Sequence, residues 1–352
     1  MKKLISLALA SVLALSLVAC SAPATDEPSA DPAAPAVTDA NGNPAPPASP
    51  KKYSMASGSV GGNFYLMGGG AAQVLNKYAP DYFNFTSETT GGGSANLSML
   101  QDGSAELGVA MSSSLYEAMQ GNADWTGGVK HDKLRGALAL YPSWLTIYTM
   151  KDSGIKSMSD LNGKIVGLGS KGAAMDAIFR KFFEENNIVP KQIHNDGHGA
   201  TATAVGNGVI DAAILFSYPP FAAISELEST NDLAFIPLSA DEQKYFTDKY
   251  DFHTASAMPS GSYKAVTADV PSISEWNMLV TSSDVPEDDV YMMIKTLCEH
   301  QDDMIAVHSS AKYMTAENTL NFNIPLHAGV VRYLKEVGIE VPAKLIPPEY
   351  KG

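Results

Sequence analysis

The stretch Glu88-Thr89-Thr90-Gly91-Gly92-Gly93-Ser94-Ala95-Asn96-Leu97 places three consecutive glycines between a predicted strand and a predicted helix. Residues 83–87 alternate and are rich in aromatic side chains, which indicates a strand, and residues 95–101 have helical spacing. Glycines allow a ligand close to the backbone, and Ser94 is a candidate N-cap residue. The unpaired N–H groups of a helix start favour an anion or a carboxylate. The stretch predicts a small-molecule seat, and a plain strand-to-helix turn is the alternative.

Two further strand–loop–helix units lie on either side of this stretch. Residues 53–57 predict a buried strand, which is followed by the loop 58–63 and a helix over 64–78. A third strand at 107–111 runs into a serine triplet that begins with Ser112 and opens another helix. Three such units in a row, each with small residues after the strand, predict a parallel sheet whose ligand-facing loops share one edge.

The second half of the chain repeats this architecture without repeating the sequence. Residues 134–150 are apolar and aromatic, and a strand at 164–168 leads through a glycine-containing loop into a helix over 173–186. A further strand at 210–215 ends at Ser217-Tyr218-Pro219-Pro220. Another helix start is indicated at 197–205, and the segment 276–282 predicts one more strand, before an acidic helix start at Glu287. Two α/β lobes with glycine-rich loops predict a ligand held in the cleft between them.

The N-terminal segment indicates export. Lys2 and Lys3 precede an apolar run over 4–19 that is too short to span a membrane, and the run ends in Leu17-Val18-Ala19-Cys20. This ending resembles a bacterial lipobox, which implies a signal peptide over 1–19 and a lipid on Cys20, and therefore an extracytoplasmic, membrane-anchored lipoprotein. Residues 21–50 hold eight prolines and no aromatic side chain. We expect residues 20–50 to act as a tether.

Composition restricts the classes of partner. The chain has 352 residues, 45% of them hydrophobic, which is enough for one large core or two moderate ones. Once Cys20 is lipidated, Cys298 is the only cysteine left, so an intrachain disulfide is excluded from the mature chain. Removal of Lys2 and Lys3 changes the formal charge from −14 to −16 (−14 minus 2). This charge argues against nucleic acid as a partner and against a polybasic membrane patch.

Catalytic and metal chemistry are weakly indicated. His194 and His198 lie four residues apart with Asp196 between them, but a zinc site needs three or four convergent ligands, so we expect solvated histidines and no metal. His327 favours a structural hydrogen bond over catalysis. The chain has no G-x-S-x-G elbow and no Walker A motif, and the loop Gly58-Ser59-Val60-Gly61-Gly62 lacks the G-x-G-x-x-G spacing, which disfavours a hydrolase and a nucleotide site.

The chain resembles the TAXI-type solute receptors of the tripartite ATP-independent periplasmic (TRAP) transporters. Four stretches carry the likeness, in the family's order: GSVGGNFY at 58–65, ETTGGGSANL at 88–97, GIKSMSDLNGK at 154–164 and PLHAGVVRYLKEVG at 325–338. The third stretch occurs in many binding proteins, whereas the other three together are more specific. They cover nearly all of the chain after Lys51.

The resemblance implies a type II periplasmic-binding-protein fold of two lobes around a central ligand cleft. The discontinuous lobe I would comprise 51–152 and 258–352, and lobe II would comprise 153–257. It also implies no catalysis and no cofactor. The expected activity is capture of a small organic anion or amino acid and its delivery to a sodium-coupled membrane permease. A lipid-anchored sensory or scaffold protein with the same fold is the alternative.

The candidate ligand-binding residues combine the strand-end loops with a predicted aromatic wall. In lobe II the family tends to have Gly-Ser-Gly-Thr where this chain has Gly172-Ala173-Ala174-Met175, a loss of two hydroxyls that could bind a carboxylate. We therefore expect a monocarboxylate or an amino acid with an apolar side chain rather than a dicarboxylate. The candidates are Gly61, Asn63, Tyr65, Thr90, Gly93, Ser94, Asn96, Ser112, Tyr141, Trp144, Ser170, Lys171, Gly172, Ala173, Met175 and Tyr218.

Overall fold

A computed structural model describes residue 38, residues 42–60 and residues 62–352. The predicted signal peptide, the lipid site Cys20, most of the predicted tether and the candidate Gly61 lie outside the described residues. The described part of the tether is packed on the folded body at one point. Pro44 is buried, and its carbonyl accepts a hydrogen bond from the Tyr82 hydroxyl at 2.7 Å. The start of the folded body at residue 51 stays a prediction, and Pro44 of the predicted tether contacts that body.

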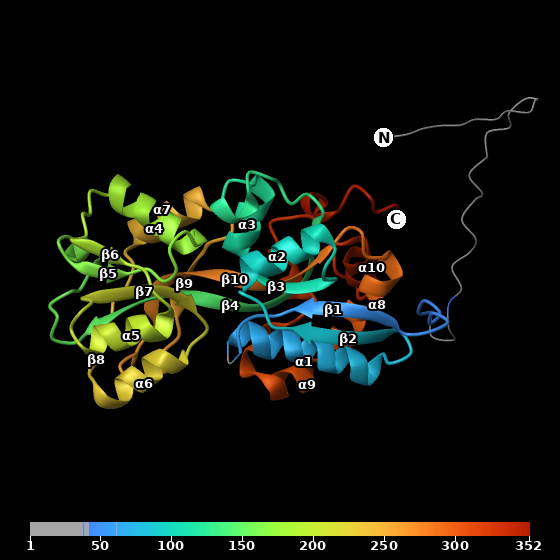
Figure 1. The fold of residues 1–352 in the computed structure, drawn as a ribbon, viewed down its shortest axis with the longest axis horizontal. Helices are drawn as coiled ribbons and strands as arrows, with labels where there is room; N and C mark the ends of the chain where they lie inside the picture. The colour runs from blue at the N-terminus through green and yellow to red at the C-terminus, as the bar shows by residue number, and fades with distance from the viewer. Residues whose placement is uncertain (1–37, 39–41, 61) are drawn as a thin grey trace, which may run out of the picture.

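One ten-stranded sheet organises the described chain, with the order β2-β1-β3-β10-β4-β7-β5-β6, β8 paired to β4 and β9 paired to β10 (Figure 1). The strands are β1 Lys51–Ala56, β2 Phe83–Glu88, β3 Leu107–Met111, β4 Leu134–Met150, β5 Ile165–Gly167, β6 Gln192–His194, β7 Ala212–Ser217, β8 Leu233–Phe235, β9 Thr254–Met258 and β10 Val270–Ser282. The predicted α/β architecture is confirmed.

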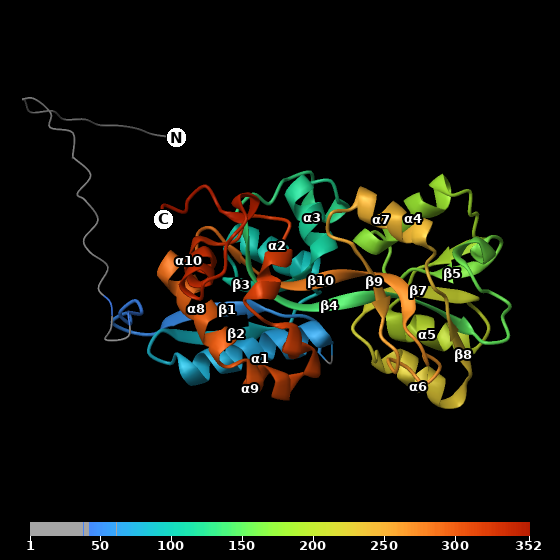
Figure 2. The same cartoon turned by 180° about the vertical axis from the view of Figure 1, so that it is seen from behind.

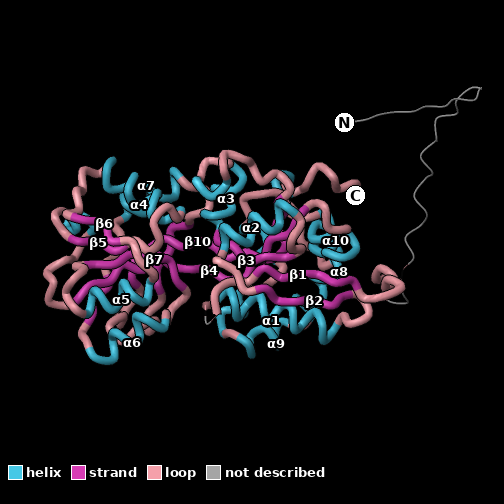
Figure 3. Tube along the Cα trace, viewed as in Figure 1, coloured by secondary structure: helices cyan, strands magenta, loops and turns pink. Residues whose placement is uncertain are grey.

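Helices cover both faces of the sheet. Figure 3 shows α2, α3, α4 and α7 along one face and α1, α5, α6 and α9 along the other. The helices are α1 Asn63–Tyr78, α2 Gly93–Asp102, α3 Ser112–Gln120, α4 Ala174–Glu185, α5 His198–Gly206, α6 Ala222–Thr230, α7 Ala240–Lys249, α8 Glu287–Glu299, α9 Gln301–Val307 and α10 Ala328–Glu336. None of the helices in the described ranges is both long and apolar enough to cross a membrane.

The three units that were predicted to form a parallel sheet do so, whereas the centre of the whole sheet runs antiparallel, which the sequence did not indicate. β1 pairs in parallel with β2 and β3, and β5 pairs in parallel with β6 and β7. Between these two groups, β10 runs antiparallel to β3 and to β4, and β4 runs antiparallel to β7. Figure 2 shows β4 and β10 crossing the middle of the molecule between its two halves.

Three buried clusters divide the core along this crossing. The first cluster takes its residues from 55–141 and 278–345, and the other two lie within 144–273 on opposite faces of the second half. Membership changes inside β4 and inside β10, because each strand contributes side chains to both halves. The division into two lobes at 152/153 and 257/258 stays a proposal, and below we use the names lobe I and lobe II in that sense.

The start of α2 differs from the prediction at the glycine triplet. The N-cap residue is Gly92, with φ +105°, and the helix begins at Gly93, so Ser94 lies inside the first turn and is not the cap. A positive φ suits glycine, and the chain reaches this conformation one residue before the serine. The triplet therefore begins the helix through backbone freedom and not through a side-chain cap.

Candidate functional site

The loops after β1 and β2 are joined to strand β3 by Asn96, which is fully buried. Its Nδ2 donates to the carbonyls of Ser57 and Val109, both at 2.7 Å, and its Oδ1 accepts from the Thr90 hydroxyl at 2.6 Å. The Thr90 hydroxyl in turn accepts from the N–H of Gly92 at 3.1 Å. These polar groups connect two strand-end loops with the middle of β3. The side chains of Thr90 and Asn96 already form hydrogen bonds within the protein. Contacts of these two side chains with a ligand stay predictions.

The start of α2 retains free backbone donors. The N–H of Asn96 closes the first helical bond, to the carbonyl of Gly92 at 3.0 Å. The N–H groups of Gly93, Ser94 and Ala95 precede it and have no protein partner in the part of the chain that the structure describes. A Cβ at Gly93 would stand 3.5 Å from the Cα of Ala110, so the turn is packed closely on β3. These N–H groups are available to a ligand, and the seat itself stays a prediction.

In lobe II, Asp176 and Asn195 hold the loop that follows β5 by hydrogen bonds. Asp176 accepts from the N–H of Gly172 at 3.1 Å, from Arg180 at 2.9 Å and from Asn195 at 3.0 Å. Burial alone would raise the pKa of Asp176, but these hydrogen bonds lower it overall. Asn195 also donates to the carbonyl of Gly169 at 2.9 Å. Sequence reasoning missed both of these residues, which fix the shape of the loop.

The predicted side chains of this loop face different surroundings. Ser170, Lys171 and Ala173 are exposed, and Lys171 makes no ion pair with any described residue. Met175 is half-buried and packs on the lobe II core. Lys171 therefore remains free to meet an anion, whereas Met175 contributes to the core as well as to any ligand wall.

Five rings gather where β4 crosses between the lobes, and we call them the aromatic group: Tyr141, Trp144, Tyr218, His308 and Tyr313. Tyr218 is central, with ring centroids 5.7 Å from Tyr141, 6.0 Å from Trp144, 5.8 Å from His308 and 6.3 Å from Tyr313. Tyr218 and Tyr313 pack against a core cluster of each half. The structure thus brings together the three predicted aromatic candidates.

Asn63 joins this group and Tyr65 does not. The side chain of Asn63, at the first position of α1, forms a hydrogen bond with the buried Tyr141, although burial raises the pKa of that phenol overall. Tyr65 instead lines a separate hollow of about 320 Å³ between α1 and β2, together with Thr89 and Val307. The sequence did not indicate that His308 and Tyr313 belong to this group. They lie about 170 residues after β4 along the chain, at a short helical segment that packs on β4.

The N-terminus of α3 is occupied by a carboxyl group of the protein itself. Ser112 is 2% exposed, and its hydroxyl donates to the carbonyl of Trp276 at 3.0 Å. The N–H of Ser113 donates to Glu275 Oε2 at 3.2 Å. Glu275 is 1% exposed, and burial raises its pKa to about 7. Sequence reasoning missed Glu275, which lies on β10 and reaches α3 only because β10 pairs with β3.

A cavity of about 370 Å³ lies between α3 of lobe I and α4 of lobe II, and we call it the interlobe groove. Figure 1 places these two helices beside each other on one face of the sheet. The lobes touch at its edge, where the rings of Tyr116 and Phe252 have centroids 5.3 Å apart. The residues that line it are Ser113, Tyr116, Glu117, Asn122, Ala123, Asp124, Gly172, Ala174, Ala177, Ile178, Lys181, Tyr250 and Phe252.

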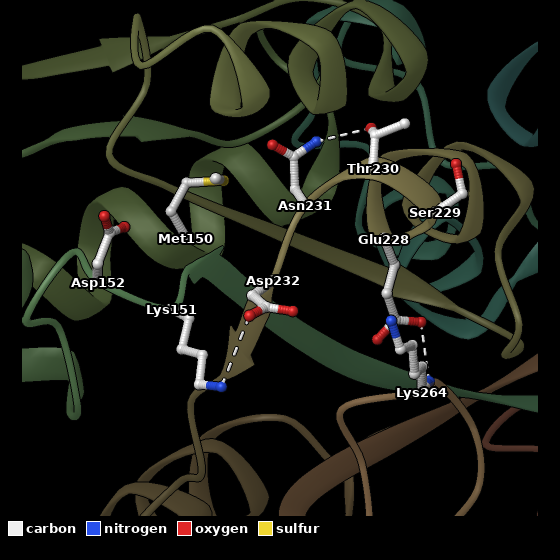
Figure 4. A pocket seen from close by; sticks show the side chains of 9 residues that line it. All are labelled: Met150, Lys151, Asp152, Glu228, Ser229, Thr230, Asn231, Asp232 and Lys264. Atoms are coloured by element: carbon white, nitrogen blue, oxygen red, sulfur yellow. Dashed lines mark hydrogen bonds and ion pairs between the residues drawn. The ribbon is translucent and has the colours of Figure 1, made fainter.

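A larger hollow of about 760 Å³ is lined by residues from 150–152, 228–232 and 264, away from the predicted residues (Figure 4). Three of its charged side chains have partners in the protein. Glu228 accepts from the N–H groups of Lys264 and Ala265 at 2.8 and 2.7 Å, and Lys151 lies 3.7 Å from Asp232. The lining residues all come from 150–264, and none of them belongs to the predicted ligand-binding residues or to the aromatic group.

The histidines have structural surroundings. His198 is not solvated as expected. Its ring covers the loop, so that a Cβ at Gly169 would stand 2.8 Å from its Cε1, and burial lowers its pKa. His327 has the predicted structural role, because its Nδ1 accepts from the N–H of Gly329 at 3.2 Å at the start of α10. No group of three or more His, Cys, Asp or Glu side chains in the described ranges is placed to hold a metal ion.

A family model described as the NMT1-like family matches residues 55–338. The chain belongs to this family. The match spans both lobes and includes every described candidate residue named above. The family assignment therefore applies to both halves of the folded body.

Solved structures with a similar fold share little sequence with the chain. A Streptococcus mutans structure, concerned with glutathione import via GshT and the cystine ABC importer TcyBC, has 15% identity, covers 75% of this chain and 95% of its own, and has a TM-score of 0.48. The periplasmic aliphatic sulphonate binding protein SsuA from Escherichia coli has 15% identity over 82% and 85%, with a TM-score of 0.45. The probable amino-acid ABC transporter extracellular-binding protein ytmK from Bacillus subtilis has 17% identity over 73% and 96%, with a TM-score of 0.45.

Proposed function

We propose that the protein is an extracytoplasmic solute receptor that binds a small molecule between its lobes and delivers it to a membrane transporter. The observation that carries this proposal is the convergence of two sets of parallel strand ends on the crossing of β4 and β10, where the aromatic group spans two core clusters. Loop ends, free helix N–H groups and aromatic rings are the parts of a small-molecule site. A ligand that touches both lobes would stabilise the closed arrangement.

The ligand class proposed from the sequence is a monocarboxylate or an amino acid with an apolar side chain. The free N–H groups at Gly93, Ser94 and Ala95 would hold a carboxylate, and the exposed Lys171 is a second partner for it. The aromatic group would cover the apolar part of the ligand. This arrangement binds and releases a solute, and the proposal includes no chemical conversion.

The finer assignment to a TAXI-type receptor of a TRAP transporter rests on the four sequence stretches that resemble that family. In this proposal Cys20 carries the lipid, residues 20–50 tether the folded body to the membrane, and a sodium-coupled permease accepts the ligand. Two of the structures reported above concern ABC importers, which ATP drives, so the energy source of uptake distinguishes the two classes of transporter.

Binding is tested by a thermal-shift screen of the purified protein with organic acids, amino acids and amines. A ligand at 100 times its Kd should add about 2.7 kcal/mol to the free energy of unfolding, which raises the melting temperature by several degrees. The bound compound should be recovered chemically unchanged. A panel without any hit, or recovery of a converted product, would contradict the proposed receptor.

Delivery is tested by uptake of the identified ligand into cells that carry the protein and its transporter. We expect uptake to require a sodium gradient and to fall when Cys20→Ala removes the lipid site, while the variant binds its ligand normally in solution. Uptake that is driven by ATP without sodium would assign the receptor to an ABC importer. Full uptake by the Cys20→Ala protein would contradict the role of the tether.

A further inference from the structure

Three carboxyl groups at the interlobe groove lack a cationic partner in the described chain, and two of them, Glu117 and Glu275, are half-buried or buried, whereas Asp124 is exposed. Glu117 lines the groove, and its single hydrogen bond comes from Trp125, whose Nε1–H donates to Oε2 at 3.0 Å. Glu275 lies behind Ser113 and accepts from the Ser113 backbone at 3.2 Å. Neither carboxyl belongs to an ion pair between described residues.

The surroundings of these carboxyls leave negative charge poorly compensated. Burial raises the pKa of Glu117 against the hydrogen bond from Trp125. Burial also raises the pKa of Glu275 to about 7 against hydrogen bonds from the side chain and the backbone of Ser113, and the charge of Glu117 adds to that rise. A buried carboxylate is costly unless hydrogen bonds or an opposite charge compensate it, and carboxylates with such perturbed pKa values gather at functional sites. The charge that would stabilise this wall of the groove is positive.

The remaining residues that line the groove include side chains that suit the hydrocarbon part of a ligand. Rings come from Tyr116, Tyr250 and Phe252, and aliphatic side chains come from Ala177 and Ile178 on α4. The volume of about 370 Å³ lies within the range of small-molecule pockets. Lys181 lines the groove from α4, opposite the α3 wall that carries Glu117, and its side chain is exposed.

We propose that the interlobe groove recognises the ammonium group of a small amine, which Glu117 contacts directly and Glu275 attracts from behind Ser113. The aromatic and aliphatic lining of the groove would hold the part of the hydrocarbon that is next to the ammonium group, and the aromatic group would cover the remainder of the molecule. This inference rests on the proposed receptor function and narrows its ligand to a primary amine or amino acid, in place of an organic anion without an amine. Glu117 and Glu275 thereby become specificity-determining residues of the interlobe site.

The inference is tested with two probes that share a hydrocarbon body, 2-phenylethylamine and 3-phenylpropionate. Titration calorimetry of the full folded protein at pH 8 measures both, because Glu275 is then largely ionised. We expect the amine to bind at least about tenfold more tightly than the carboxylate, the size of effect that one charge-assisted hydrogen bond supports. Equal affinity, or tighter binding of 3-phenylpropionate, would overturn the inference.

The variant Glu117→Gln removes the charge and keeps an oxygen that can accept from Trp125. We expect it to bind 2-phenylethylamine about tenfold more weakly and to bind 3-phenylpropionate no more weakly than the wild type. The matched control is Glu106→Gln, which alters another half-buried lobe I carboxyl. That carboxyl accepts from the N–H of Ser54 at 2.7 Å and does not line the groove. We expect it to leave both affinities unchanged.

A second variant keeps the test decisive if Glu117→Gln folds poorly. Lys181→Gln changes an exposed side chain of α4 and removes a like charge from the neighbourhood of a bound ammonium group. We expect it to tighten amine binding by about threefold. If Lys181 instead pairs with Glu117 when the lobes close, the variant will bind the amine more weakly, and the inference is then wrong. Absence of binding by either probe also overturns it, whereas the receptor function is judged by the ligand screen and the uptake experiment.

Discussion

A single imidazole in lobe II carries a large pH effect. His253 is 5% exposed and lies among the rings of Phe216, Phe246, Tyr250 and Phe252, with centroids 4.6 to 5.9 Å away. Burial lowers its pKa to about 3, against a weaker opposite effect of the Phe246 backbone. The imidazole is therefore neutral in the folded protein, and its protonation opposes folding.

The sign of the effect follows from the two states of the chain. The unfolded chain takes up a proton on His253 below about pH 6.5, whereas the folded chain does so only near pH 3. The stability linked to His253 is complete above about pH 6.5 and is lost progressively as the pH falls toward 3. At pH 5 the loss is about 2 kcal/mol. We expect His253→Phe, whose ring suits the aromatic surroundings, to lose about that much less stability than the wild type between pH 7.5 and pH 5.

Urea denaturation at the two pH values measures this difference. Glu275 changes stability in the opposite direction, because its raised pKa favours the folded state at low pH, but it is present in both proteins and cancels in the comparison. Equal losses in the wild type and in His253→Phe would show that His253 is not the responsible group.

Residue types were predicted better than the contacts they make. The sequence indicated that Tyr141, Trp144 and Tyr218 form a wall, and the structure brings them together. It gave no sign that Asn96 would use its whole amide group to connect two loops with β3, or that Glu275 would occupy the start of α3. Hydrogen-bond partners of this kind depend on which distant strands become neighbours, and local patterns do not contain that information.

At the scale of elements, the glycine triplet begins α2 through one unusual backbone conformation. Gly92 has φ +105°, which costs a non-glycine residue strain of about 1–2 kcal/mol. Gly91 has no such φ, and a Cβ there would meet only the Cβ of Ala95, at 3.8 Å. We expect Gly92→Ala to lower the free energy of unfolding by about 1–2 kcal/mol, whereas Gly91→Ala should be close to neutral.

Urea denaturation of the two alanine variants against the wild type measures this contrast, and Gly91→Ala is the matched control. Similar losses in both variants would mean that glycine is required in this loop because of close packing and not because of the φ of Gly92. The result also bears on ligand binding, because the free N–H groups of Gly93, Ser94 and Ala95 depend on the same turn.

Elements with a clear sequence pattern were predicted well, whereas several short elements and the 17-residue strand β4 were not. The sequence indicated β1, β2, β3, α1 and α8, because each has a clear period or a bounded apolar run. It missed β6, β8 and β9, of three to five residues, and the helices α6, α7 and α9. A three-residue strand such as Gln192–His194 has too few side chains to show alternation, and it becomes a strand only by pairing with β5.

At the scale of the whole molecule, β4 and β10 make the two halves of the sheet one structure. β4 pairs with β10 from Leu134 to Trp144 and with β7 from Trp144 to Thr149, so its backbone enters the ladders of both halves. The sequence predicted two lobes but not this sharing, because residues 134–150 read simply as an apolar run. Two lobes joined by continuous strands can change their mutual angle only by bending those strands, and the aromatic group lies beside the place where they would bend.

This shared sheet predicts that the folded body unfolds in one cooperative transition in urea, although its core has three clusters. Far-ultraviolet circular dichroism and tryptophan fluorescence should give the same midpoint. Tyr218→Ala removes a half-buried ring that touches a cluster of each half, and we expect it to lower the free energy of unfolding by about 2 kcal/mol while the transition stays single. Tyr245→Ala is the matched control, because that ring packs against one lobe II cluster only. If Tyr218→Ala separates the midpoints of the two signals and Tyr245→Ala does not, then the aromatic group, and not the pair of crossing strands, couples the lobes.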